Sequence, residues 1–204
     1  MSSFFILSCI AIVLLAGILS LELIARYTKF SDIIIRKAGH TGLALLIVDI
    51  ALYIGKDLFF PIGLSFTVIA FLLRQLPLKS LGPFKSTSYG EVLFPLGVGL
   101  SALITTNLND FIISVLILGL ADTAAHISGV FIHSLKLVGD KTLAGTIAFA
   151  IISLIIILIG TGSVWAFVIA PVIAIVELVS RRGSDNLTIP VTASLLLYLV
   201  NYLV

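Results

Sequence analysis

The chain is a series of long apolar runs separated by short polar breaks. Eight runs qualify as candidate membrane spans: residues 4–25, 41–55, 58–73, 91–107, 110–133, 143–160, 163–180 and 187–203. A helix of about 17–25 mostly apolar residues crosses the hydrocarbon core of a bilayer. The runs do not alternate apolar and polar residues with a period of two, which argues against barrel strands. The pattern therefore predicts an all-α, polytopic membrane bundle.

The number of spans depends on one boundary. The second and third runs are short and only Lys56 and Asp57 separate them, so the pattern predicts seven or eight helices. The first run has no basic segment before it and is too long for a cleavable signal, so we expect a retained helix. No soluble domain, low-complexity segment or convincing repeat is visible. We predict one transmembrane domain over residues 1–204.

Composition agrees with lipid as the solvent. Of the 204 residues, 60% are hydrophobic and 11% are charged, and the mean hydropathy is +1.26. A soluble domain of this size could not bury so much apolar surface. The single cysteine, Cys9, can form neither an internal disulfide nor a multi-cysteine metal site. We expect the lipid bilayer as a partner and no nucleic acid; no pattern indicates an oligomeric state.

The basic residues fall almost entirely on one side of the predicted bundle. Of the 12 Lys and Arg residues, 11 lie in the connections after the first, third, fifth and seventh runs: Arg26, Lys29, Arg36, Lys37, Arg74, Lys79, Lys85, Lys136, Lys141, Arg181 and Arg182. The other connections are the short stretches "KD", "NLN" and "GTG". Basic loops stay in the cytoplasm, so this distribution predicts a cytoplasmic basic face, with the N-terminus and the C-terminus outside.

Most acidic residues lie at the same face. Only Asp57 and Asp110 fall in the outer connections, and Asp49 lies in the middle of a run. A charged side chain inside a membrane is costly and suggests a functional site. A soluble, multiply charged substrate could arrive at the face where the charges converge. A transporter would instead carry polar groups through the whole depth of the bundle.

The stretch "IIRKAGH", residues 34–40, combines two cations with an imidazole. In a helix, Arg36 and His40 share a face at a spacing of four, and Lys37 points aside. Arginine binds phosphate in a bidentate manner and lysine acts as a point charge, so the stretch suits a phosphate chain. A basic anchor at the membrane surface explains the same residues equally well.

A polar stripe lies in "LADTAAHISGVFIH", residues 120–133. Its members are spaced for one helix face: Asp122, His126, Gly129 and His133. Asp122 would serve as a Mg²⁺ ligand or as the general base for a hydroxyl, or the stripe is a hydrogen-bonded contact between helices. In a straight helix, Asp122 lies about 16 Å below the end of the run at His133. A helix break near Ser128 and Gly129 would lift it towards the surface.

Two further stretches open helices at the basic face. In "GDKTLAGT", residues 139–146, Thr142 is a candidate N-cap and Lys141 adds charge for a phosphate, although the stretch is not a P-loop. An ordinary capped helix start is the alternative. Glu91 also opens a helix, where it favours the helix dipole or holds a metal.

The last stretch is "RRGSDNLTIP", residues 181–190. Asp185 and Asn186 supply hard oxygen ligands for Mg²⁺, and Arg181 and Arg182 suit phosphate. Ser184 or Asp185 is the expected N-cap. A capped basic loop accounts for the arginines, but not easily for both oxygen ligands. We expect Asp185 to lie near Asp122, 63 positions earlier in the chain.

In their order and spacing, five stretches resemble those of one family. They are "RKAGH" at 36–40, "YGEVLFPLG" at 89–97, "ADTAAHISG" at 121–129, "KTLAGT" at 141–146 and "DNLTIP" at 185–190. The family is the CTP-dependent lipid-alcohol kinases, which include dolichol kinase, phytol kinase and the yeast-type diacylglycerol kinase. The chain departs from the family at Ala121, where members usually have Gly, and at Val130, where they often have a basic residue. Its short length is similar to that of bacterial or archaeal members, so we expect a bacterial or archaeal cytoplasmic membrane.

The resemblance implies transfer of the γ-phosphoryl group of CTP, or of another nucleoside triphosphate, to the hydroxyl of a polyprenol, phytol-like alcohol or diacylglycerol. It implies Mg²⁺ as the cofactor and a site that faces the cytoplasm. The implied catalytic residues are Asp122, Lys37, His40 and Lys141. The implied phosphate-binding residues are Arg36, Lys37, Lys141, Thr142, Arg181 and Arg182, and the implied metal ligands are Asp122, Asp185, Asn186 and Glu91.

Two other functions are compatible with these residues. One is a cytidylyltransferase or kinase that acts on a lipid monophosphate. The other is a small transporter in which Asp49 and Asp122 form an intramembrane relay.

Overall fold

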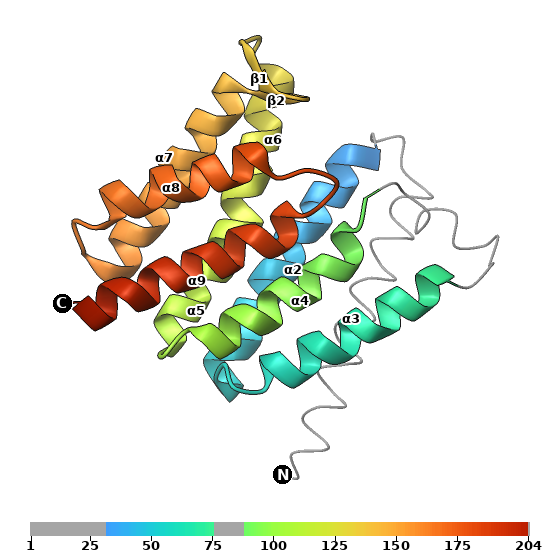
Figure 1. The fold of residues 1–204 in the computed structure, drawn as a ribbon, viewed down its shortest axis with the longest axis vertical. Helices are drawn as coiled ribbons and strands as arrows, with labels where there is room; N and C mark the ends of the chain where they lie inside the picture. Colours follow the sequence, from blue (N-terminus) through green and yellow to red (C-terminus); the bar gives the residue numbers. More distant parts are fainter. Residues whose placement is uncertain (1–31, 76–87, 204) are drawn as a thin grey trace.

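The computed structural model describes residues 32–75 and 88–203, which are almost entirely helical (Figure 1). The elements in chain order are α2 (Asp32–Ile54), α3 (Phe59–Gln75), α4 (Gly90–Ile104), α5 (Leu108–Leu116), the π-helical turn η2 (Ile117–Ala121), α6 (Asp122–Phe131), β1 (Lys136–Val138), β2 (Lys141–Thr142), α7 (Leu143–Thr161), α8 (Ala166–Val179) and α9 (Asp185–Leu203). Seven of the predicted apolar runs therefore contain helices. The first run, 4–25, and Cys9 lie outside the described residues.

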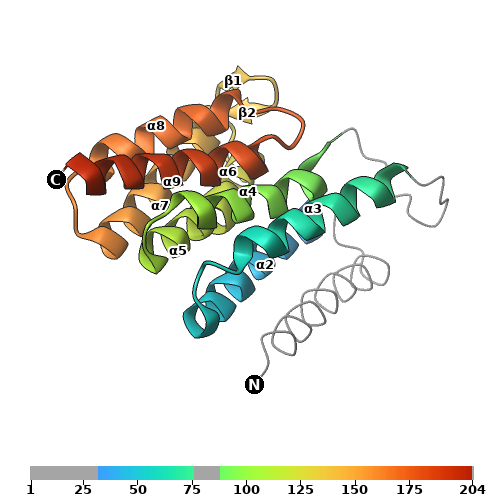
Figure 2. The same cartoon turned by 60° about the horizontal axis from the view of Figure 1, so that its bottom comes forward.

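The helices pack around two central elements. One is the continuous rod of α5, η2 and α6, which contacts α2, α7 and α9, and the other is α9, which also contacts α4 and α8. Helix α3 packs on α4 at one side of the bundle, and α7 and α8 lie at the other side (Figures 1 and 2). This arrangement is an all-α bundle, as the hydrophobic pattern predicts.

Four of these helices are long and apolar enough to cross a membrane. The qualifying stretches are Lys37–Ile54, Leu108–Phe131, Leu143–Thr161 and Asp185–Leu203. The apolar helices α3, α4 and α8 are shorter, with 17, 15 and 14 residues. The described residues thus fit a membrane bundle but do not support a count of eight spans. The runs shorten because turns take residues from their ends: Thr105 adopts an extended conformation after α4, and Gly162 (φ 63°) ends α7 before the turn that leads to α8.

The connection between α6 and α7 is a small β-hairpin, which the hydrophobic pattern did not predict. Helix α6 ends at Phe131, two residues before the end of the predicted run, and β1 pairs with β2 in antiparallel fashion. The hairpin is tied to the start of α7, because the Leu143 amide donates to the Leu135 carbonyl at 2.8 Å. It brings Thr142 back against α6, since a Cβ at Gly129 would lie 3.0 Å from Thr142 Oγ1.

The helix has no break near Ser128 and Gly129, because both residues lie inside α6. The irregularity lies instead in the π-helical turn η2, directly before Asp122. A π-turn inserts extra backbone into a helix and often accompanies a functional site. Here it also docks α2: the Thr41 hydroxyl donates to the Gly119 carbonyl at 3.0 Å, and a side chain at Gly119 would collide with Ala44.

Candidate functional site

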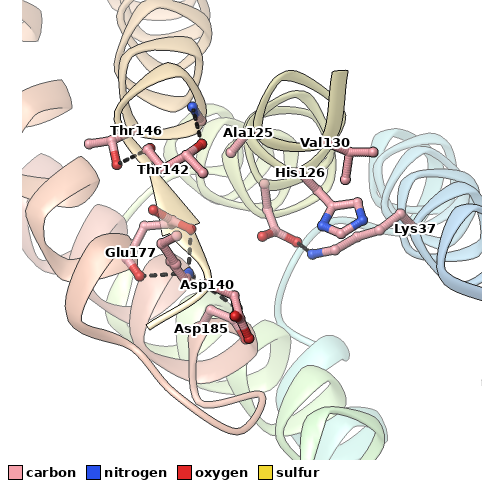
Figure 3. A pocket seen from close by; sticks show the side chains of 13 residues that line it. Lys37, Ala125, His126, Val130, Asp140, Thr142, Thr146, Glu177 and Asp185 are labelled. Carbon is pink, nitrogen blue, oxygen red and sulfur yellow. Dashed lines mark hydrogen bonds and ion pairs between the residues drawn. The ribbon is translucent and has the colours of Figure 1, made fainter. Parts of the chain in front are cut away.

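A cavity of about 320 Å³ lies where α6, the hairpin, α7, α8 and the start of α9 meet the first turns of α2 (Figure 3). Most of its polar wall consists of side chains that are far apart in the sequence. The lining residues are Lys37, Asp122, Ala125, His126, Gly129, Val130, Asp140, Lys141, Thr142, Gly145, Thr146, Glu177 and Asp185. The cavity therefore gathers residues from four of the five stretches that carry the family resemblance.

The first ion pair in the cavity joins α2 to α6. The Lys37 ammonium donates to Asp122 Oδ2, and the Asp122 residue is only 3% exposed. Thr41, one turn after Lys37 on the same face, donates or accepts at 2.8 Å with the Thr123 hydroxyl. Lys37 thus points into the cavity, away from the side of α2 on which His40 lies. Contact of α2 with η2 and α6 through Thr41 decides this orientation.

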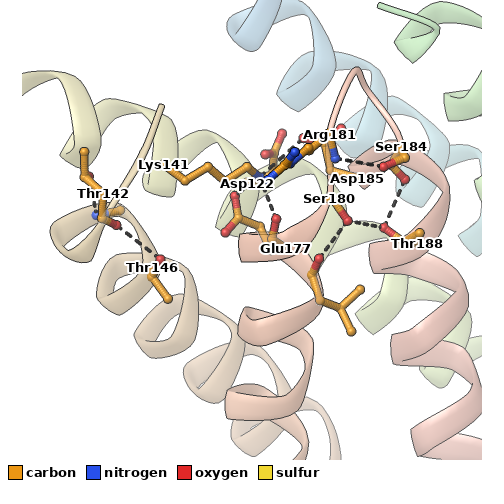
Figure 4. A network of polar contacts seen from close by, with 12 residues as sticks. Asp122, Lys141, Thr142, Thr146, Glu177, Ser180, Arg181, Ser184, Asp185 and Thr188 are labelled. Carbon is orange, nitrogen blue, oxygen red and sulfur yellow. Dashed lines mark hydrogen bonds and ion pairs between the residues drawn. The ribbon is translucent and has the colours of Figure 1, made fainter. Parts of the chain in front are cut away.

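The second ion pair joins the hairpin to α8 and α9 (Figure 4). The Lys141 ammonium donates to the Glu177 carboxylate and to the Glu177 backbone carbonyl, the latter at 2.7 Å. The same nitrogen lies 3.7 Å from Asp185 Oδ2. Glu177 is nearly fully buried, so its carboxylate depends on Lys141 for compensation. Lys141 is consequently held between two acids that belong to different helices.

The N-terminus of α7 forms another part of the wall. The Thr142 hydroxyl accepts from the Gly145 amide at 3.2 Å, which confirms Thr142 as the N-cap of this helix. Gly145 and Thr146, in the first turn, also line the cavity. The helix dipole at this N-terminus favours anions, although the first amides of α7 already donate to Leu135, Ser134 and Thr142.

The turn before α9 positions Asp185. Gly183 has φ +84°, and a side chain there would come within 2.6 Å of the Gly90 amide nitrogen. The Tyr89 amide donates to the Arg182 carbonyl at 3.0 Å, so the turn is fixed against the start of α4. Ser184 precedes the first residue of α9, and its hydroxyl accepts from the Arg181 amide at 3.1 Å. Because the turn is held this closely, Asp185 enters the cavity beside Lys141.

Asp122 and Asp185 therefore line the same cavity, as the sequence predicts. With His126 neutral, the wall carries two lysines against four carboxylates. Carboxylate oxygens are suitable ligands for Mg²⁺, which typically takes one or two protein carboxylates together with phosphate oxygens. The described residues contain no group of three or more His, Cys, Asp or Glu side chains arranged to hold a metal on their own. Asp122 and Asp185 fit a metal that is shared with a phosphate ligand better than a metal site built from protein alone.

Several residues expected at the site lie elsewhere. The His40 ring packs against Phe94, with ring centroids 5.2 Å apart. Glu91 accepts from Arg74 at 2.6 Å. Asn186 is buried against Gly90, and Arg181 and Arg182 are exposed on the turn. None of these five lines the cavity.

Two other residues named in the sequence analysis are Arg36 and Asp49. The side chain of Arg36 lies outside the described residues. Asp49 is exposed on α2 and is not part of the cavity wall, so the described contacts do not link it to Asp122.

Two acids in the wall were not expected as site residues, Glu177 and Asp140. Glu177 did have a detectable signal, because it is the only charged residue of the apolar helix α8. A charge in such a helix needs a specific partner. Asp140 had no comparable signal, since it lies in a polar turn where an acidic residue is ordinary.

Comparisons with known protein families, with characterised proteins and with solved structures found no match to this chain.

Proposed function

We propose that this protein is a membrane-embedded kinase that transfers the γ-phosphoryl group of CTP to the hydroxyl of a lipid alcohol. One observation carries the proposal: Lys37, Asp122, Lys141 and Asp185, which come from four separate stretches, line one cavity. Phosphoryl transfer needs little covalent chemistry from a protein, and mainly requires positioned charges. Paired lysines and carboxylates around a capped helix N-terminus supply such charges.

Lys37 and Lys141 are proposed to bind the phosphate oxygens. A triphosphate would compete with Asp122 and Glu177 for the two ammonium groups, and the helix dipole at the start of α7 would favour its negative charge. Asp122 and Asp185 would hold Mg²⁺, which would supply positive charge to the phosphate oxygens. Arg181 and Arg182 do not line the cavity, but they are exposed on the turn that leads to Asp185 and would attract an approaching triphosphate.

The proposed transfer breaks one bond to the γ-phosphorus and forms another. The bond between the γ-phosphorus and the oxygen that bridges to the β-phosphate breaks, and CDP leaves with that electron pair. A bond forms between the γ-phosphorus and the oxygen of the alcohol. The hydroxyl proton passes to a carboxylate of the cavity, and Asp122 is the proposed acceptor because it lies beside a phosphate-binding lysine.

The proposed topology rests on the distribution of Lys and Arg residues among the connections of the chain. Eight spans, with both termini outside, would place the cavity at the cytoplasmic face of a bacterial or archaeal membrane. The three short helices α3, α4 and α8 would then cross with tilt or with local thinning of the bilayer. Cysteine-accessibility labelling of the loops in intact cells measures this topology.

The test is a transfer assay with purified protein in detergent. Labelled CTP and Mg²⁺ are supplied with farnesol, geranylgeraniol, phytol, undecaprenol or diacylglycerol, and we expect a labelled phosphate on at least one alcohol. If a well-folded preparation phosphorylates none of them, the kinase proposal is wrong.

Product mass separates the kinase from a cytidylyltransferase, since the lipid gains a phosphate in one case and a CMP group in the other. The transporter alternative makes a different prediction. Transport through a relay would be abolished by Asp49→Asn, whereas kinase activity would not.

A further inference from the structure

The end of the bundle that carries the cavity also carries an unusually apolar surface. It consists of the end of α6 and the first part of the hairpin, residues 130–137, here called the apex. Phe131 is 71% exposed and Leu135 is 68% exposed, and Val130, Ile132 and Leu137 are also exposed. A connection that projected into water would not normally expose five large apolar side chains in eight residues.

The apex is held in a defined conformation. Its Leu135 carbonyl accepts from the Leu143 amide, and its Ser134 hydroxyl accepts from the Ala144 amide at 3.0 Å. Both donors belong to the first turn of α7, whose amides lack partners within the helix. The apex therefore completes the hydrogen bonding of α7 with its backbone and Ser134, and this leaves the apolar side chains on the outside.

The apolar surface of the apex continues along the membrane-length helix α7. Leu143, Ile147, Ile151 and Ile155 are all exposed and recur every four residues, so they form one stripe along α7. The stripe begins where the hairpin ends. Ile127 and Val130 extend the exposed apolar surface on α6, the last part of the span Leu108–Phe131. A surface that is continuous with two candidate spans meets the same lipid as they do.

The other turn at the site has the opposite character. Residues 180–184 expose Arg181 and Arg182, and no large apolar side chain of that turn is exposed. Arginines favour the aqueous edge of a bilayer, and apolar side chains beside a lysine favour the boundary between headgroups and acyl chains. Lys136, between Leu135 and Leu137, can extend its ammonium to the phosphate layer. The cavity lies between these two connections.

We propose that the apex inserts into the headgroup–acyl boundary of the bilayer, so that one wall of the cavity faces lipid. Val130 belongs to both surfaces, since it is 59% exposed and also lines the cavity. A lipid can then leave its chain in the bilayer while its headgroup enters beside Val130. This route rests on the proposed function, because it assumes a lipid acceptor. The insertion itself does not.

Tryptophan quenching tests the insertion in the full chain. The only tryptophan, Trp165, is first replaced by Phe, and single tryptophans are introduced as Leu135→Trp or Leu137→Trp. Ile147→Trp is the control for a lipid-facing position and Arg181→Trp the control for a water-facing one. The proteins are placed in nanodiscs with or without brominated phosphatidylcholine, and aqueous iodide is the second quencher.

We expect brominated lipid to reduce the emission of both apex variants by about half, as for Ile147→Trp, because interfacial tryptophans contact acyl chains directly. Iodide should quench only Arg181→Trp strongly. Iodide quenching of both apex variants to the level of Arg181→Trp would overturn the proposal, since the apex would then lie in water. Protection from both quenchers would also overturn it, because a second copy of the chain or another protein would cover the apex.

A kinetic measurement tests the route. The double variant Leu135→Glu with Leu137→Glu should raise the KM for a long-chain alcohol about tenfold, because charge disfavours insertion at the interface. The KM for CTP should not change, and neither should turnover of a short, water-soluble alcohol. An unchanged KM for the long-chain alcohol overturns the route. If the wild-type protein phosphorylates no alcohol, the proposed function fails, while the quenching result still decides the insertion.

Discussion

Two buried carboxylates on the same helical rod have different kinds of partner. Asp122 and Asp110 are each 3% exposed, and they lie 12 positions apart along α5, η2 and α6. Asp110 accepts from Asn107 at 2.7 Å and from Asn201 at 2.6 Å. Within the described part of the chain it takes part in no ion pair. Asp122 instead pairs with a lysine beside a cavity.

The difference separates a structural acid from a candidate catalytic one. Two neutral amides donate to Asp110 Oδ2, and the one from Asn201 connects the start of α5 to the end of α9. A lysine beside Asp122 is a mobile cation that a phosphate ligand can draw away from the acid, and the cavity leaves space for that ligand. An acid in a membrane helix therefore suggests function only when its partner and the adjoining space allow a ligand to compete.

The largest expected effect is on transfer activity at Asp122. Asp122→Asn keeps the shape of the side chain and removes its charge and its basicity, so we expect turnover to fall by about 10²–10³-fold. The matched control, Asp110→Asn, should change turnover per folded molecule by less than about twofold, since that residue does not line the cavity. Labelled-CTP transfer after size-exclusion chromatography measures both. Equal losses in the two variants would remove the distinction between the two acids.

A smaller effect is expected at Glu177, which holds Lys141. Glu177→Gln leaves the backbone carbonyl to accept from Lys141 but removes the charge, so the ammonium loses its position between two acids. We expect the KM for CTP to rise by about tenfold, because one charge-assisted hydrogen bond is worth about 1.5–3 kcal/mol. Turnover should change less than the KM. Glu91→Gln is the control, since Glu91 pairs with Arg74 outside the cavity. A change in thermal stability without a change in the KM would assign Glu177 a purely structural role.

The smallest effect should come from a polar contact near Asp110. The buried hydroxyl of Ser194 donates to that of Ser114 at 3.0 Å, which joins α9 to α5. A double-mutant cycle with Ser114→Ala and Ser194→Ala should give a coupling of about 0.6 kcal/mol in unfolding, the average for hydrogen bonds between membrane helices. Transfer activity per folded molecule should not change. A loss of activity in this cycle would show that the far end of the bundle acts on the cavity.

Much of the cavity could be predicted from local patterns in the sequence. The apolar runs predict the helices, and three of the four residues of the predicted polar stripe, Asp122, His126 and Gly129, line the cavity. The fourth, His133, lies after the end of α6 and does not line it. Thr142 is the N-cap that its position before an apolar run predicts. These features depend on residues a few positions apart, where helix geometry decides which side chains are neighbours.

Features that depend on how helices meet could not be predicted. Lys37 and His40 both lie in "RKAGH", but only Lys37 enters the cavity, because α2 docks on η2 through Thr41 and Gly119. The same docking leaves His40 against Phe94. The hairpin was equally hidden, since its two strands are too short to show a periodic pattern.

By itself, the sequence determined the apolar helices of the bundle, and it predicted that Asp122 and Asp185 lie at one site. The tertiary structure decided which charged groups share the cavity: it added Glu177 and left out Glu91 and Asn186. The physical reason is that apolar and polar periodicity specifies one helix at a time. The partner of a buried charge depends on how closely the backbones of two helices approach. Here that approach depends on the π-helical turn η2, on Gly119 and Gly183, and on the Thr41 hydroxyl.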